Sequence, residues 1–206
     1  MRKGIAYDPF PMSLRIRKRL LMMRSVQRAA LDLFELHGFE PVAVEEVGRV
    51  SEVSPSTIYR HFKTKERLVL WDEADAAIES ALKKHLGTCA PLEALRSSFL
   101  EAYSGLEPDE FLHLRRRGAL IDQTPQLYAA MAGDLVAARI EIQEALGLVY
   151  RSKCRDLDAE MTARVAMESL MAGFELWQRS SPRTSLARCI ERAFDAATRL
   201  KPSWDA

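Results

Sequence analysis

The polar side chains best placed for chemistry lie between residues 43 and 68, where their spacing suits contact with DNA. Ser54 is a strong N-cap, and Pro55 follows at the first helical position, where a missing N–H does no harm. Beyond its polar first turn, this predicted helix has an apolar back formed by Ile58 and Phe62, four residues apart. Such a helix can insert its N-terminal end into the major groove of DNA.

Two further helices are needed to position it. A short helix is predicted over about 44–50, and a long one over about 13–37, where apolar residues recur at spacings of three and four until Gly38. The apolar stripe of the short helix and the turn after it are built from valines: Val44, Val47, Val50 and Val53. The three helices can share one small core, so the sequence predicts a helix-turn-helix motif.

The rest of the chain is also predicted to be helical. Thr64 is the expected N-cap of a long fourth helix over about 64–86, which ends before Gly87. Five more helices are predicted at about 92–104, 108–121, 125–150, 157–179 and 184–200. About nine helices, without a sequence repeat or a long linker, indicate an all-α protein.

Three groups of motifs occur in a fixed order near the start of the chain. Ala29-Ala30-Leu31-Asp32-Leu33-Phe34 is followed by His37-Gly38-Phe39, and next comes Val44-Glu45-Glu46-Val47. The third group is Val53-Ser54-Pro55-Ser56-Thr57-Ile58-Tyr59-Arg60-His61-Phe62 with Lys63-Thr64-Lys65-Glu66-Arg67-Leu68. With these motifs, the segment of about 17–70 resembles the DNA-binding domain of the tetracycline-repressor-type (TetR) family of transcriptional regulators.

The resemblance implies a set of DNA contacts on the recognition helix and beside it. Tyr59 and His61 can reach phosphates, and Lys65 combines a cation with the start of the fourth helix. The predicted DNA-binding residues are Arg24, Glu45, Pro55, Ser56, Thr57, Tyr59, His61 and Lys65.

Glu45 and the arginines of the first helix each have two possible roles. Glu45 either accepts a hydrogen bond from a cytosine amino group or caps the start of its own helix. Arg24 and Arg28 either join a basic arm that follows the DNA backbone or enters its minor groove, or lie on a solvated face. The arm consists of Arg15, Arg17, Lys18, Arg19, Arg24 and Arg28.

Glu52 departs from the family pattern, which usually has glycine at this position of the turn. A side chain in the left-handed region costs roughly 1 to 2 kcal/mol. Glu52→Gly is therefore expected to raise the melting temperature slightly if the turn uses a positive φ.

The charge of the chain is divided unevenly. Residues 1–65 carry more Lys and Arg than Asp and Glu, and the remainder carries more acids than bases. This asymmetry is typical of a chain of which one end meets a polyanion. We expect a helix-turn-helix DNA-binding domain over 15–70, a helical effector-binding and dimerisation domain over 71–206, and a mobile extension over 1–14, which contains two prolines.

The resemblance also implies the function of the helical body, residues 71–206. In the family the body binds a small-molecule effector and forms the homodimer, and the fourth helix is the expected lever between effector and DNA. The candidates for lining an apolar effector site are Trp71, Phe99, Tyr103, Phe111, Leu114, Tyr128 and Met131. The last two helices are apolar on more than one face, which predicts a dimer interface containing Met171, Phe174, Trp177, Ile190 and Phe194. The alternative is that they are ordinary core helices of a single chain. Residues 115–117 are three consecutive arginines. Because successive residues of a helix point in different directions, at most one or two of these side chains can face the interior.

Other functional classes find little support in the sequence. The chain has no nucleotide-binding glycine motif, nucleophile elbow or metalloprotease motif, so we expect no enzyme, no metal and no cofactor. Three cysteines without metal-ligand spacing are expected to be buried free thiols. No apolar run reaches the length of a membrane span or a signal peptide, which favours a cytoplasmic protein without a membrane partner.

The sequence therefore predicts a DNA-binding transcriptional regulator. The expected form is a homodimeric repressor that a small-molecule effector releases from a palindromic double-stranded operator. The alternative is a helical ligand-binding or protein-interaction module without specific DNA recognition. The two differ in the salt dependence of binding, which is steep only where phosphates are neutralised.

Overall fold

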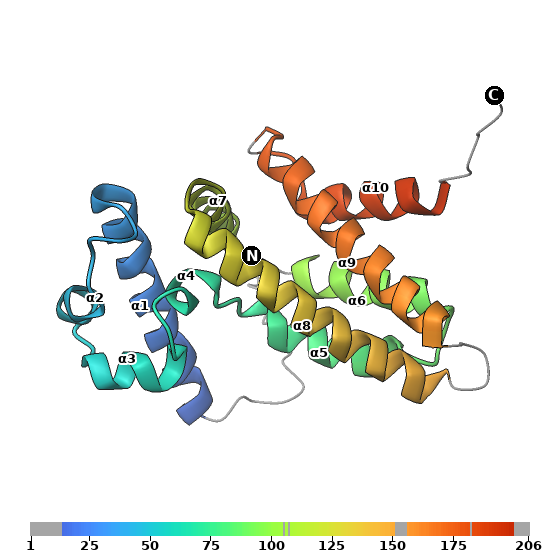
Figure 1. Ribbon diagram of the computed structural model, residues 1–206, viewed down its shortest axis with the longest axis horizontal. Helices are drawn as coiled ribbons and strands as arrows, with labels where there is room; N and C mark the ends of the chain where they lie inside the picture. Colours follow the sequence, from blue (N-terminus) through green and yellow to red (C-terminus); the bar gives the residue numbers. More distant parts are fainter. Residues whose placement is uncertain (1–13, 105, 107, 151–155, 182, 200–206) are drawn as a thin grey trace, which may run out of the picture. The chain divides into compact units, whose positions relative to one another are not determined.

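The structure is a computed structural model that describes residues 14–104, 106, 108–150, 156–181 and 183–199. Over these ranges it contains ten helices and no strand (Figure 1), which confirms the all-α prediction. The chain divides into two compact units, the first ending at Trp71 and the second beginning at Asp72. Residues 1–13 of the predicted extension lie outside the described residues.

The first unit is built by four helices around one small core. They are α1 (Leu14–His37), α2 (Val44–Ser51), α3 (Pro55–Phe62) and α4 (Arg67–Leu70). The ring of Phe34 meets that of Phe39 edge to face at 5.0 Å between centroids. Val47, Ile58 and Leu68 of the same unit are also buried. Gly38 ends α1 with a φ of 86°, a left-handed conformation that glycine adopts without a steric penalty.

The single helix predicted over 64–86 is wrong, because the chain forms α4 and then α5 (Ala74–His85). The buried side-chain amide of Gln27 donates to the carbonyl oxygens of Val69 (3.2 Å) and Trp71 (2.8 Å), which satisfies the end of α4. The Trp71 ring also packs edge-on against Phe62, with centroids 6.0 Å apart. A carboxylate oxygen of Asp72 then accepts the Ala74 N–H at 2.9 Å and starts α5.

The second unit consists of α5 and five further helices. These are α6 (Pro91–Ser104), α7 (Pro108–Gln123), α8 (Pro125–Val149), α9 (Asp156–Gln178) and α10 (Leu186–Arg199). Their shared core contains the fully buried Phe99 and Phe194, which are 6.2 Å apart, and Trp177, whose indole N–H donates to the Thr184 carbonyl at 3.0 Å. The predicted helix bounds differ from these by one or two residues.

Helices α9 and α10 approach each other closely at Gly173. A Cβ added to Gly173 would lie 2.8 Å from the Cα of Ile190 and 3.0 Å from its Cγ1. Because this distance is shorter than any ordinary carbon contact, only glycine permits the two backbones to approach so closely.

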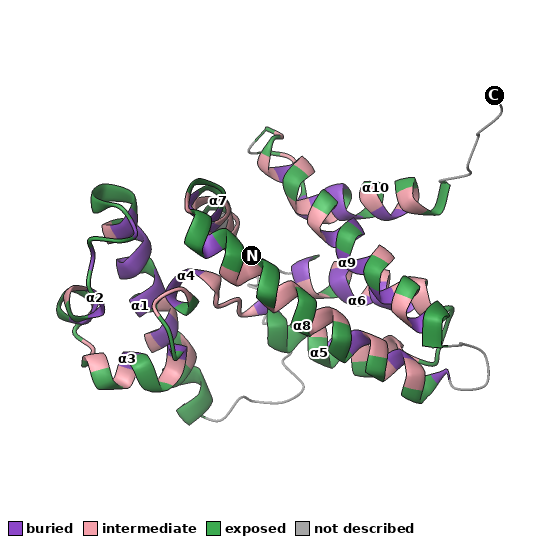
Figure 2. Ribbon diagram, viewed as in Figure 1, coloured by how far each residue is buried: buried purple, intermediate pink, exposed green. Residues whose placement is uncertain are grey.

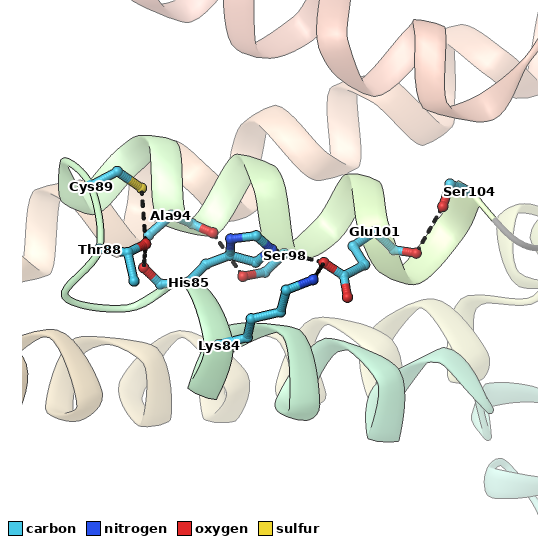
Figure 3. A network of polar contacts seen from close by, with 8 residues as sticks. All are labelled: Lys84, His85, Thr88, Cys89, Ala94, Ser98, Glu101 and Ser104. Carbon is cyan, nitrogen blue, oxygen red and sulfur yellow. Dashed lines mark hydrogen bonds and ion pairs between the residues drawn. The ribbon is translucent and has the colours of Figure 1, made fainter. Parts of the chain in front are cut away.

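Polar contacts fasten α5 to α6 (Figure 3). One carboxylate oxygen of Glu101 on α6 accepts the ammonium of Lys84 and pairs with His85 Nε2, both on α5 and both at 2.8 Å. These hydrogen bonds lower the pKa of the Glu101 carboxyl. Beyond α5, the Tyr150 hydroxyl accepts the Gly87 N–H and donates to the carbonyl of Cys89, so the loop between the helices is held. Cys89 is exposed, which corrects the prediction that it is buried.

Candidate nucleic-acid interface

The turn before α3 is closely built. The Val53 N–H donates to the Gly48 carbonyl at 3.0 Å, and a Cβ added to Gly48 would lie 2.7 Å from the Val53 oxygen. Glu52 has a φ of 56° and a ψ of 31°, so the turn uses the left-handed conformation in which the family usually has glycine. The angle at which α3 leaves α2 is thus fixed by backbone contacts.

The predicted cap of α3 is present. The Ser54 side chain accepts the N–H of Thr57 at 3.3 Å, and Pro55 occupies the first turn. The Ser54 hydroxyl also donates to Thr57 Oγ1 at 2.9 Å and lies 3.2 Å from the hydroxyl oxygen of Ser56. The recognition helix therefore starts at a defined residue, with three hydroxyl groups held close together at its N-terminal end.

The two sides of α3 differ in burial. Ile58 and Phe62 are 1% and 3% exposed and face the core of the first unit. Ser56 and Tyr59 are exposed, and the remaining predicted contacts on this helix, Pro55, Thr57 and His61, are half-buried. The predicted DNA-binding residues of α3 thus lie on its outward side and flanks.

The C-terminal end of α3 turns sharply at Lys63. This residue has a φ of 69° and a ψ of −50°, and the Thr64 N–H donates to the Phe62 carbonyl at 2.8 Å across it, which defines a γ-turn. Thr64 Oγ1 then accepts the Arg67 N–H at 3.4 Å. The N-cap position of α4 is nevertheless occupied by Glu66, which corrects the prediction that Thr64 caps this helix.

Lys65 precedes α4 and is partly engaged within the first unit. Its ammonium donates to the Glu40 carbonyl at 3.0 Å and lies 4.5 Å from the ring centroid of Phe39. Burial lowers the pKa of this lysine. An ammonium has three donors, so the observed hydrogen bond leaves room for a phosphate as a further acceptor.

Positive charge gathers around the end of α3. The pKa of His61 lies below 6.5 because of partial burial and, after that, the neighbouring cations Arg60, Arg19 and Lys63. Arg19 belongs to α1, so the first helix contributes to the same basic surface. Clustered cations of this kind attract the phosphate backbone of nucleic acid.

The first turns of α1 are exposed, whereas its buried residues lie between Met23 and Phe34 (Figure 2). Its exposed basic residues are Arg15, Arg17, Lys18, Arg19 and Arg28, and Arg24 is half-buried. On α2, Glu45 is exposed and forms no hydrogen bond or ion pair with another described residue, so no capping contact of this side chain is observed.

Arg60 is missing from the residues predicted by sequence reasoning. It is exposed, one helical turn after Ser56 and on the opposite side of α3 from Ile58. The spacing of four from Ser56 is the signal in the sequence that identifies its position.

The residues predicted to line an effector site divide into three groups. Phe99 and Tyr103 are buried, and Phe111, Leu114 and Met131 are half-buried. Tyr128 is 58% exposed, and Trp71 packs on Phe62 in the first unit. These positions argue against Tyr128 and Trp71 as lining residues of the second unit.

One ion pair is embedded near the lining candidate Tyr103. Arg117 is 8% exposed and contacts a carboxylate oxygen of Asp72 at 3.3 Å. The pKa of Tyr103 is raised by burial and next by the Asp72 carboxylate. Arg115 instead stacks on Trp177 at 4.2 Å and donates to the carbonyl of Gln178, which caps α9. Arg117 is thus the arginine of the run that faces the interior.

Burial also corrects the predicted dimer interface. Trp177, Ile190 and Phe194 are at most 1% exposed within one chain, so they present no surface to a partner. Met171 and Phe174 are half-buried and keep some accessible surface. No helix in the described ranges has the length and apolar character of a membrane span.

Comparisons with known proteins match both units. Residues 27–70 match the model described as bacterial regulatory proteins of the tetR family, and residues 89–200, more than half of the chain, match the MftR C-terminal domain. The chain is 24% identical over 87% of its length to a Mycobacterium tuberculosis protein named as mycofactocin biosynthesis transcriptional regulator MftR, covering 90% of that protein. It is also 32% identical, over 56% of its length, to the HTH-type transcriptional regulator TcmR of Streptomyces glaucescens, covering 54% of it.

A solved structure has the same fold. NalD, described as the secondary repressor of a multidrug efflux pump in Pseudomonas aeruginosa, superimposes with a TM-score of 0.53 at 20% identity, covering 87% of this chain and 96% of NalD. The outward recognition helix, the basic surface beside it and the two matching family models agree, and the chain belongs to the TetR family of DNA-binding transcriptional regulators.

Proposed function

We propose that this protein is a repressor that binds a palindromic operator as a homodimer and leaves it when a small-molecule effector binds the second unit. DNA binding is supported mainly by the two sides of α3. Ser56 and Tyr59 are exposed on its outward side, while Ile58 and Phe62 are buried on the opposite side. The relatives named as regulators, and NalD as a repressor, support the same function.

The proposed DNA contacts divide by the part of DNA that they reach. Ser56 and Thr57 lie at the front turn of α3, from which side chains reach base edges in the major groove. Tyr59, His61 and Lys65 are proposed to bind phosphates, together with Arg24 and the exposed basic arm at the start of α1. Glu45 is proposed to accept from a cytosine amino group, and Pro55 packs beside the groove.

The proposed effector is a largely apolar molecule. The candidates that remain for its site are Phe99, Tyr103, Phe111, Leu114 and Met131, all of which lie in the second unit. Arg117 and Tyr103 supply polar groups inside this otherwise apolar region. An acidic group on the effector would be stabilised by the Arg117 guanidinium.

A homodimer is required for reading a palindrome. Two recognition helices must lie about one helical turn of DNA apart, which two copies related by a twofold axis provide. On α9, Met171 and Phe174 are the proposed contacts, and Leu157 and Met161 are further exposed apolar side chains of this helix.

Release follows from thermodynamic linkage. An effector that prefers the conformation in which the two recognition helices are wrongly spaced weakens operator binding by its own difference in affinity for the two states. Because the operator is chromosomal DNA, the function implies a place in the bacterial cytoplasm.

Fluorescence anisotropy of a labelled mixed-sequence duplex at rising salt separates this function from the alternative of a helical module without DNA recognition. We expect the logarithm of the association constant to fall steeply and linearly with the logarithm of the salt concentration, because several phosphates are neutralised. Tyr59→Phe, which removes the phenolic hydroxyl but keeps the ring, is expected to weaken binding at every salt concentration. A shallow salt dependence, or no binding by the folded protein at low salt, contradicts the proposal.

The effector part has its own test. Ligands that raise the melting temperature of the protein are selected from a panel of apolar carboxylic acids, and each is then added to the protein–operator complex. At least one stabilising ligand is expected to release the DNA. If ligands that bind tightly leave operator affinity unchanged, effector release is contradicted while DNA binding stands.

A further inference from the structure

Arg60 occupies the middle of the outward side of the recognition helix. It lies two residues after Ile58 and two before Phe62, the side chains that face the core, so a helical period of 3.6 points it away from that core. Ser56 lies one turn earlier on the same side. Both residues are exposed, and together they define the line along which α3 would meet a base-pair edge.

The Arg60 guanidinium forms no hydrogen bond or ion pair with any other residue that the structure describes. Arg115 shows the contrast, since its guanidinium lies over the Trp177 ring and donates to the carbonyl oxygens of Gln178 and Ser180. All five N–H donors of Arg60 are therefore available to a ligand without breaking an internal contact.

The other outward side chains of α3 have weaker means of reading a base. Ser56 and Thr57 carry single hydroxyl groups, and those already lie within hydrogen-bond distance of Ser54. Tyr59 carries one phenolic hydroxyl. Only Arg60 has two parallel donors, the arrangement that matches the O6 and N7 acceptors of guanine in the major groove.

The helix that carries Arg60 is fixed at both ends. Its start is held by the Ser54 cap and by the turn at Gly48, and its end by the γ-turn at Lys63. Rigid support of this kind is what a bidentate contact requires, because both donors must meet their acceptors at the same time.

We propose that Arg60 is a specificity-determining residue that reads one guanine in each half-site of the operator through a bidentate contact in the major groove. This inference rests on the proposed DNA-binding function and goes further, because it assigns base preference to a particular side chain. It also divides the basic surface into a base-reading cation and phosphate-binding cations such as Lys63 and Arg19.

The test compares duplexes selected from a random library by the wild-type protein with those selected by R60Q. Wild-type selection is expected to return one invariant guanine per half-site. R60Q is expected to bind that sequence about 5- to 150-fold more weakly and to lose its preference at that position alone. R60K keeps the charge and can still pair with guanine, so it is expected to restore part of the preference.

Lys63→Gln serves as the matched control, because it removes one exposed cation of the same surface. It is expected to weaken binding to all sequences alike, to reduce the salt slope by about one phosphate, and to leave the guanine preference intact. A thermal melt of each variant establishes that the exposed substitutions leave the fold unchanged.

Two results overturn the proposal. In one, R60Q weakens every duplex equally with the guanine preference retained, which identifies Arg60 as a phosphate contact. In the other, R60Q binds and selects like the wild type. A wild-type protein that is folded but selects no sequence contradicts the proposed function itself, and this outcome is distinct from both.

Discussion

Single side chains decide what α3 presents to a partner. Ile58 and Phe62 are drawn into the core, and this orientation turns Ser56, Tyr59 and Arg60 outward. The same surface gains Arg19 from α1, whose charge reaches His61. The polar side of the helix and its basic surroundings are therefore consequences of how the apolar side packs.

Glu52→Gly is predicted to stabilise the first unit. A residue with a Cβ in the left-handed region costs roughly 1 to 2 kcal/mol, and the greater freedom of glycine in the unfolded chain offsets about 0.4 to 1 kcal/mol of that. The free energy of unfolding should rise by about 0.5 to 1 kcal/mol, measured by denaturant titration. Glu52→Ala keeps the Cβ and should give no such gain, so an equal gain in both variants would disprove the explanation.

His61 is predicted to make operator binding dependent on pH. In the free protein the pKa of this ring lies below 6.5, whereas a phosphate beside it favours the charged form and raises the pKa in the complex. Binding then takes up a proton. Affinity should be greatest below the free-state pKa and fall as the pH rises through the pKa of the complex, by about tenfold for each unit of pKa difference.

The check is a series of dissociation constants at constant ionic strength on both sides of pH 6.5. His61→Gln should flatten the profile, and His37→Gln, which alters an exposed histidine at the end of α1, should leave it unchanged. A wild-type profile without slope, or the same slope in His61→Gln, argues against a phosphate at His61.

Local signals in the sequence predicted some residues of the site and missed others. The Ser54 cap and the tight turn at Glu52 depend on near neighbours, so the sequence contains them directly. Arg60 lies within the family motif, but the resemblance implied no DNA contact for it. Its helical spacing from Ser56 does place it on the outward side of α3. The exposure of Tyr128 depends on how α8 packs against other helices, so it cannot be predicted from the neighbouring residues in the sequence.

Among the helices, the break between α4 and α5 could not be predicted from the residues around it. The segment 67–73 contains no glycine or proline, so nothing in it signals a break. The break is stabilised by Gln27, more than forty residues earlier, whose amide binds the carbonyls of Val69 and Trp71. A contact so distant in sequence outweighs the helical preference of the segment itself.

The crossing of α9 and α10 is predicted to depend on Gly173. A methyl group there would lie 2.8 Å from the backbone of Ile190, so Gly173→Ala should lower the free energy of unfolding of the second unit by about 1 to 3 kcal/mol. Gly133→Ala, in the interior of α8 with no atom within 4 Å of the added Cβ, should raise it by about 0.4 to 1 kcal/mol. Denaturant unfolding of both variants tests the pair, and similar effects in the two would contradict the packing argument.

For the whole molecule, the sequence predicted the fold class and the family because both depend on repeated patterns: helical periodicity throughout and ordered motifs near the start. The interior of the second unit was less predictable. Trp177, Ile190 and Phe194 have the apolar spacing of an interface, yet the same spacing places them in the core of one chain. Periodicity marks which side of a helix is buried without stating whether its own chain or a partner covers it.

We propose that two copies of this chain together read a palindromic DNA sequence. The most direct measurement is selection of bound duplexes from a random library by the purified full-length protein, followed by sequencing. We expect an inverted repeat whose half-sites lie about one helical turn apart. Failure of a folded protein to enrich any sequence at low salt, or enrichment of an isolated half-site without its inverted copy, would contradict it.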